Sequence, residues 1–168
     1  RVSNLSKNKN LKKETLFIKK KINFFIKNLF KINNFKLKKS ELIISPCDFN
    51  INNIILDKKK FYFIDFEYSG LDSYSKLISV FILQPDYYIP FNLFKKIINK
   101  IINILPNNKN KNLKILTSLI PLIYLKWSLI ILNQINKSKN RTSFYKSKFY
   151  KYIQSREEYF IKFTKIVN

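Results

Sequence analysis

The sequence predicts a mostly helical α+β fold that contains one small β-hairpin. Apolar residues recur at spacings of three and four over most of the chain, which is typical of amphipathic helices. The stretch 54–66 instead combines β-branched and aromatic residues around a polar turn, which indicates a hairpin. Gly occurs once and Pro five times in 168 residues, so long regular elements with few tight turns are expected.

The first half of the chain is expected to hold one helix, one strand end and the hairpin. The predicted elements are a lysine-rich lead-in over 1–13, a helix over about 14–30, a polar loop over 32–40, an extended run over 41–45, and strands over 54–56 and 61–66 joined by a turn. The run at 41–45 is expected to be the end of a strand and not a helix, because proline disfavours helical geometry in the residue before it.

Beyond Gly70 the chain is expected to be entirely helical. Asp72 or Ser73 supplies the N-cap of the first of these helices, since a short side-chain oxygen can accept a free N–H of the first turn. The predicted helices cover about 72–83, 91–105, 113–135 and 143–166, with a proline-bracketed loop at 85–90 and a polar linker at 106–112.

The segment 115–135 is the most apolar part of the chain, and it is long enough to be considered as a membrane span. Lys126 lies near its centre, where a charge opposes insertion, and Pro121 interrupts it. We therefore expect a buried core helix and no membrane span.

The formal charge of +23 raises the question of a nucleic-acid partner. Ala is absent, Arg occurs only at positions 1, 141 and 156, and Lys, Asn, Ile, Phe and Tyr are abundant, which is the residue set of A/T-rich codons. Base composition of the gene therefore explains the lysines, and the scarcity of Arg removes the usual bidentate base contacts. We do not expect nucleic acid as the partner, although a functional basic face stays open.

Three scarce residue types limit the chemistry. Cys47 is the single cysteine, so an internal disulfide is impossible and a cytoplasmic location is expected; a small filler role suits this thiol better than a reactive one. His is absent, which excludes His-dependent triads and general bases. Met is also absent, and we expect the chain to be a fragment of a longer protein.

The residues that carry chemistry lie between Ser45 and Glu67. Asp48 is followed five residues later by Asn53. The predicted hairpin has Asn53 before its first strand and Asp65 near the end of its second, so it can bring these two residues to one end. A phosphotransferase needs one carboxylate to orient an attacking hydroxyl, and an amide with a second carboxylate to hold Mg²⁺ against ATP phosphates. Glu67 would share a strand face with Asp65. Alternatively, Asp48 is a turn former and the spacing of Asn53 is chance.

The motifs around these residues resemble the aminoglycoside phosphotransferase and choline kinase family of protein-kinase-like small-molecule kinases. That family has a loop H-G-D-x-x-x-x-N followed by I-D-F-E, and one branch of it reads S-P-S-D-F-G-x-H-N and then F-I-D-F-E-Y-x-G-x-D-D-P-x-K-L. This chain has S-P-C-D-F from Ser45, F-I-D-F-E-Y-S-G-L-D-S-Y-S-K-L from Phe63, and a further similar segment over 125–133.

The resemblance implies that residues 1–168 form the C-terminal catalytic lobe of such a kinase, without the N-terminal lobe that grips ATP. It implies Asp48 as the catalytic residue, and Asn53 and Asp65 as the ligands of Mg²⁺ and ATP. Asp72 would brace the site and Lys76 would line the acceptor pocket. The expected reaction is ATP- and Mg²⁺-dependent phosphorylation of a hydroxyl on a sugar or amino-alcohol acceptor.

The chain also departs from the family pattern. Pro46 stands where the usual loop has His, as it does in the branch, while Asn50 and Asn52 replace the branch's Gly and His. Nothing over 1–40 resembles the lysine-bearing strand that pairs with ATP phosphates. An alternative hypothesis is therefore a catalytically inactive, kinase-like basic module that binds nucleic acid or an anionic surface.

Overall fold

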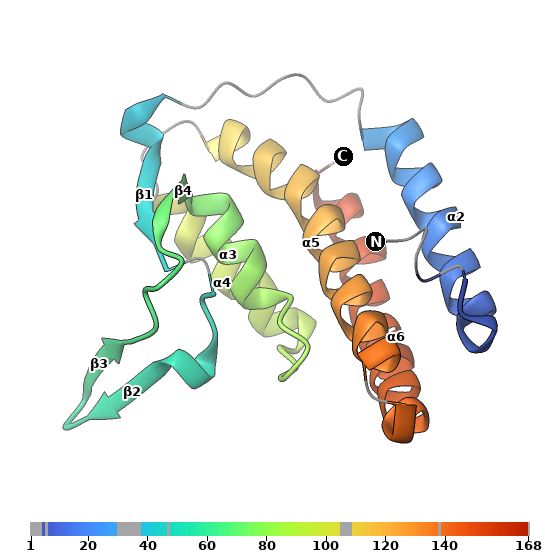
Figure 1. The fold of residues 1–168 in the computed structure, drawn as a ribbon. Helices are drawn as coiled ribbons and strands as arrows, with labels where there is room; N and C mark the ends of the chain where they lie inside the picture. Colours follow the sequence, from blue (N-terminus) through green and yellow to red (C-terminus); the bar gives the residue numbers. More distant parts are fainter. Residues whose placement is uncertain are drawn as a thin grey trace. The chain divides into compact units, whose positions relative to one another are not determined.

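The structure, a computed structural model, has an α+β and mostly helical fold, as the sequence predicts (Figure 1). It describes Leu5 and the ranges 7–29, 38–46, 48–104, 109–137 and 139–167. The chain divides into two compact units. Unit 1 comprises Arg1–Asn33 and Ile120–Asn168, and unit 2 comprises Asn34–Leu119.

Unit 2 contains two short antiparallel ladders and the helices that accompany them. Its elements are η2 (Lys39–Glu41), β1 (Leu42–Ser45), η3 (Ile51–Asn53), β2 (Ile54–Asp57), β3 (Lys60–Phe63), β4 (Gly70–Ser73), α3 (Tyr74–Ile82), α4 (Phe91–Ile104) and the first part of α5 (Lys109–Lys137). Strands β1 and β4 lie beside α3, whereas the β2–β3 hairpin extends away from these elements (Figure 1).

Both ladders are antiparallel, but only the hairpin has a short connection, because β1 and β4 are separated by residues 46–69. In the first ladder Leu42 lies opposite Ser73, and in the hairpin Ile54 lies opposite Phe63. Lys58 and Lys59 form the hairpin turn with φ values of 43° and 71°. Two successive left-handed residues match the twist of the flanking strands, which is why such turns close two-residue hairpins.

The strand boundaries correct two predictions. The second hairpin strand was expected over 61–66 but ends at Phe63, and Gly70–Ser73, expected to begin a helical region, is strand β4. The reason for the second difference is tertiary, because β1 supplies the partner backbone groups that β4 needs. Of the two predicted caps, Ser73 is the N-cap of α3, and its Oγ accepts the Lys76 N–H at 3.1 Å.

The core of unit 2 comes from the apolar faces of its helices. On α4, Phe94, Ile98 and Ile102 recur every four residues and are buried, whereas Phe91, Ile97 and Ile101, which have core spacing in the sequence as well, are half-buried. Val80, Ile82 and Leu83 of the α3 region are buried as well. The first turn of α5 is held by an ion pair between Lys111 and Glu41.

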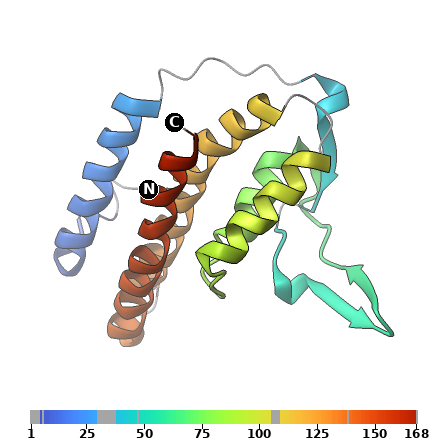
Figure 2. The same cartoon turned by 180° about the vertical axis from the view of Figure 1, so that it is seen from behind.

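Unit 1 is helical in its described part. It contains η1 (Lys9–Leu11), α2 (Lys12–Leu29), the rest of α5, η4 (Lys139–Arg141) and α6 (Thr142–Val167). Figure 2 shows α2, α5 and α6 running alongside one another. Phe17 and Phe149 pack edge to face at 6.3 Å, and Tyr124 stacks on Tyr152 at 5.7 Å. Burial of the two tyrosines raises the pKa of both phenols.

Helix α5 begins earlier than predicted and continues through Pro121. Proline removes one N–H donor from the helix but does not end it here. The segment Lys109–Ile135 is long and apolar enough to cross a membrane by length and composition, a test that core helices of soluble proteins also pass. The predicted role as a core helix therefore stays a prediction.

Candidate active site

Asp48 lies in the loop that follows β1, two residues after Pro46. Its N–H donates to the Pro46 carbonyl at 2.6 Å, which folds the loop tightly after the strand. The side chain is exposed, and within the described part of the chain its carboxylate accepts no hydrogen bond and forms no ion pair. Cys47, the other candidate in this loop, lies outside the described residues.

Asn53 connects the two acidic residues of the site. Its Nδ2 donates to the backbone carbonyl of Asp48 at 3.0 Å and, in a longer contact, to Oδ2 of Asp65 at 3.4 Å. The Ile64 N–H donates to the Asn53 carbonyl at 3.0 Å, so the ladder of the hairpin continues one step beyond its strands. The hairpin thereby brings Asn53 and Asp65 to one end, as the sequence predicts.

The surroundings of Asp65 differ from the prediction. Asp65 was expected within an apolar strand over 61–66, but it lies two residues after β3, and it is exposed together with Ile64 and Phe66. Its φ is +64°, a left-handed conformation that is uncommon for residues other than Gly. Asp adopts this conformation more readily than most residues do. A strained backbone conformation persists only where the surrounding structure holds it, and such conformations cluster at functional sites.

Glu67 does not share a strand face with Asp65. The alternation of side chains holds only within an extended strand, and the backbone here turns at Asp65. A further turn follows, in which the Ser69 N–H donates to the Phe66 carbonyl at 2.9 Å. Glu67 is exposed in that turn, so its predicted supporting role loses its geometric basis.

Phe49, which sequence reasoning did not single out, anchors the loop that carries Asp48. Its ring lies 5.5 Å from that of Phe63 at the end of β3 and 5.0 Å from that of Phe81 on α3. Its carbonyl accepts a long hydrogen bond of 3.5 Å from Nε2 of Gln84. One aromatic side chain thus joins the Asp48 loop, the hairpin and α3. The feature of the sequence that could have identified Phe49 is its position as an aromatic residue directly after Asp48.

Asp72 and Lys76 form a pair of their own. The Lys76 ammonium donates to Oδ2 of Asp72, and Oδ1 of Asp72 accepts the Ser73 N–H at 2.8 Å. The pair joins the end of β4 to the first turn of α3. This contact braces the β4–α3 junction. The ammonium of Lys76, which was expected to line an acceptor pocket, is therefore paired with Asp72.

The oxygens around Asn53 suit a hard divalent cation. Since Nδ2 of Asn53 donates the hydrogen bonds to Asp48 and Asp65, its Oδ1 is left as an acceptor, and Oδ1 of Asp65 has no partner within the described residues. Mg²⁺ uses one or two protein oxygens and keeps several waters. No group of three His, Cys, Asp or Glu residues that could hold a metal occurs among the residues described, so a metal here would rely on this sparse pair.

Comparisons of the chain with models of protein families, with curated proteins and with solved structures found no match.

Proposed function

We propose that the chain is the C-terminal catalytic lobe of a kinase-like phosphotransferase, which transfers phosphate from ATP to a hydroxyl of a small molecule. The observation that carries the proposal is the position of the Asn53 amide between the Asp48 loop and the Asp65 carboxylate. It supports the predicted roles because a phosphotransferase site requires these three groups in one place. The motif resemblance supplies the family, and the α+β fold is consistent with it.

In this proposal Asp48 orients the acceptor hydroxyl and takes its proton as the oxygen attacks the γ-phosphorus. The new oxygen–phosphorus bond forms while the bond from the γ-phosphorus to the β,γ-bridging oxygen breaks, and ADP leaves with that electron pair. The carboxylate of Asp48 suits the task because it is exposed and its oxygens are not engaged by the described residues.

Asn53 and Asp65 would hold Mg²⁺ through their side-chain oxygens. A bound Mg²⁺ neutralises charge on the phosphate oxygens. The role of the protein is to fix the two ligands relative to the Asp48 loop, which the Asn53 hydrogen bonds and the contact between the Phe49 and Phe63 rings do. The proposed acceptor is a sugar or an amino alcohol, and the proposed compartment is the cytoplasm.

The test is Mg²⁺-dependent binding of ATP by the chain, measured by isothermal titration calorimetry with and without EDTA. We expect Asp65→Asn to weaken Mg²⁺–ATP binding by about tenfold or more, since a charged metal ligand is lost. Asp57→Asn is the matched control, because Asp57 is an equally exposed carboxylate at the opposite end of the same hairpin. Equal losses in both variants would contradict the proposed metal site.

The role of Asp48 is tested separately, by an assay of phosphoryl transfer. We expect Asp48→Ala to leave Mg²⁺–ATP binding within about twofold of the parent protein and to reduce transfer by about a hundredfold or more, the range for loss of a general base. Transfer that survives Asp48→Ala would remove Asp48 from the mechanism.

A further inference from the structure

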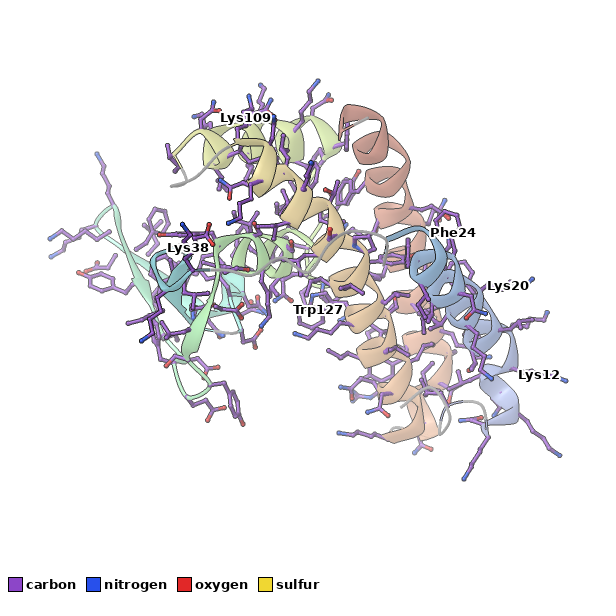
Figure 3. The ribbon with its side chains drawn as sticks, turned by 90° about the horizontal axis from the view of Figure 1, so that it is seen from above. Lys12, Lys20, Phe24, Lys38, Lys109 and Trp127 are labelled. Atoms are coloured by element: carbon purple, nitrogen blue, oxygen red, sulfur yellow. The ribbon has the colours of Figure 1, made fainter. Side chains whose placement is uncertain are left out.

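The outer face of α2 combines unpaired lysines with exposed apolar side chains. Its exposed residues are Lys12, Lys13, Leu16, Lys19, Lys20, Asn23, Phe24 and Ile26. On a helix of 3.6 residues per turn these positions fall on one side. In Figure 3, Lys12 and Lys20 point away from the helices of unit 1. These eight residues form the outer face of α2.

The opposite side of α2 packs against the rest of unit 1, and the charged residues of α2 that have a partner lie on that side. Ile18 and Phe25 are buried there. Glu14, the only acidic residue of α2, is also buried, where it accepts a hydrogen bond from the Tyr150 hydroxyl at 2.8 Å and lies 3.6 Å from Lys146 Nζ. Lys21 pairs with Glu157 at 2.6 Å.

The only charges on the outer face are consequently positive. Its four lysines, at 12, 13, 19 and 20, have no ion pair with any residue in the described ranges. Base composition accounts for the number of lysines in the chain, but it does not explain why the one acid of this helix is turned inward. The placement of the charges therefore indicates an anionic partner.

The apolar side chains between the lysines identify the class of that partner. Leu16 is 53% exposed, Phe24 59% and Ile26 51%. Nucleic acid is bound through phosphate contacts and salt-dependent counterion release, to which Leu16 and Ile26 contribute nothing. An aromatic ring such as Phe24 can stack on a base, but the two aliphatic side chains beside it have no such partner. An anionic bilayer takes up both groups, because lysines remain at the phosphates while apolar side chains enter the boundary of the acyl chains.

We propose that the outer face of α2 docks the protein on the surface of an anionic lipid bilayer, without spanning it. The surface lies in unit 1, and all residues of the proposed phosphotransferase site lie in unit 2. The proposal is independent of the catalytic one, so either can fail alone.

The charge test uses the full chain and sedimentation with vesicles of equal parts phosphatidylserine and phosphatidylcholine, against vesicles of phosphatidylcholine alone. We expect binding to the phosphatidylserine vesicles only. The variant Lys12→Glu/Lys19→Glu/Lys20→Glu should bind them at least tenfold more weakly, given about fivefold per basic residue at an anionic surface. The matched control Lys95→Glu/Lys96→Glu/Lys100→Glu makes the same charge change on exposed positions of α4. Equal loss in the control would overturn the assignment to α2.

The apolar test separates a bilayer from nucleic acid. We expect Leu16→Ser/Phe24→Ser/Ile26→Ser to weaken vesicle binding about tenfold, with circular dichroism unchanged because all three side chains are exposed. The control Leu93→Ser/Ile104→Ser removes exposed apolar groups from α4. If the α2 variant binds vesicles like the parent protein, or if the parent prefers polyuridylic acid to the vesicles, the proposal is wrong.

Discussion

The two antiparallel ladders of unit 2 have the same size but different support. Each pairs four residues with four. The β1–β4 ladder buries Ser45 and Ser73, is tied to α3 by the Asp72–Lys76 pair, and follows η2, where Glu41 pairs with Lys111. In the β2–β3 hairpin every residue except Ile54 is exposed.

This difference shows where the structural support of the candidate site comes from. A lone two-stranded hairpin is marginal in water. The hairpin carries Asn53 and Asp65 at its base, and the described contacts that hold it there are the contact between the Phe49 and Phe63 rings and the hydrogen bonds of the Asn53 side chain. The site therefore lies on a lightly supported element joined to a better supported one, and variants on the two sides should behave differently.

The largest effect is expected from the packed side. Phe94 is fully buried in unit 2, and Phe94→Ala should destabilise it by about 3–5 kcal/mol, the usual cost of removing a buried aromatic ring. The control Phe61→Ala removes the same ring from the hairpin, where it is 65% exposed, and should cost less than about 0.5 kcal/mol. Urea denaturation measures both, and similar losses would mean that the hairpin is not the exposed element described.

The second largest loss of stability is expected at Phe49, whose ring connects the hairpin to α3. Phe49 is half-buried, so Phe49→Ala should cost about 2 kcal/mol, roughly half of a full aromatic truncation. Hydrogen exchange should show the loss mainly in the amides of β2 and β3, since local opening needs less energy than global unfolding. Phe66→Ala, the control, truncates an exposed ring after β3. A uniform rise in exchange over unit 2 would show that Phe49 is a core residue and not a local anchor.

The sequence was sufficient for the helices and for the existence of the hairpin. The four-residue repeat of Phe94, Ile98 and Ile102 is a local signal, and the helix that it predicts is present. The polar turn at Lys58 and Lys59 between apolar runs is local as well. Local periodicity decides such elements because each turn or hairpin is formed by neighbours in the chain.

The sequence was not sufficient where distant residues decide the structure. Strand β4 exists because β1 pairs with it, and nothing within Gly70–Ser73 encodes that partner. The end of β3 at Phe63 and the left-handed Asp65 also break a run of residues that reads locally as a strand. The spacing of Asn53 and Asp65 was enough to place them together, whereas the environment of Asp65 and the position of Glu67 required the backbone.

At the β4–α3 junction, the N-cap of α3 and the Asp72–Lys76 ion pair should contribute differently to stability. Ser73→Ala removes the oxygen that accepts the Lys76 N–H and should cost about 1 kcal/mol. Lys76→Ala removes a partly exposed ion pair and should cost only about 0.5 kcal/mol or less. Thermal unfolding of the two variants distinguishes them. If Lys76→Ala is the more damaging, the ion pair and not the cap holds the β4–α3 junction.

A pH-dependent effect is expected at Glu41, next to β1. The hydrogen bond from the Lys111 ammonium, followed by that from the Lys38 N–H, lowers the pKa of the Glu41 carboxyl below its ordinary value of 4.5. A carboxyl with a lowered pKa stabilises the fold fully above its unfolded pKa, and this contribution is lost as the pH falls through the folded pKa.

Stability of the parent protein should therefore decline below about pH 4.5, and Glu41→Gln should flatten that part of the profile. The matched control is Glu67→Gln, since Glu67 is exposed and has no ion pair with the described residues. Urea midpoints measured across the acid range make the comparison. A profile that Glu41→Gln leaves as steep as before would assign the acid sensitivity to carboxylates outside the η2–β1 junction.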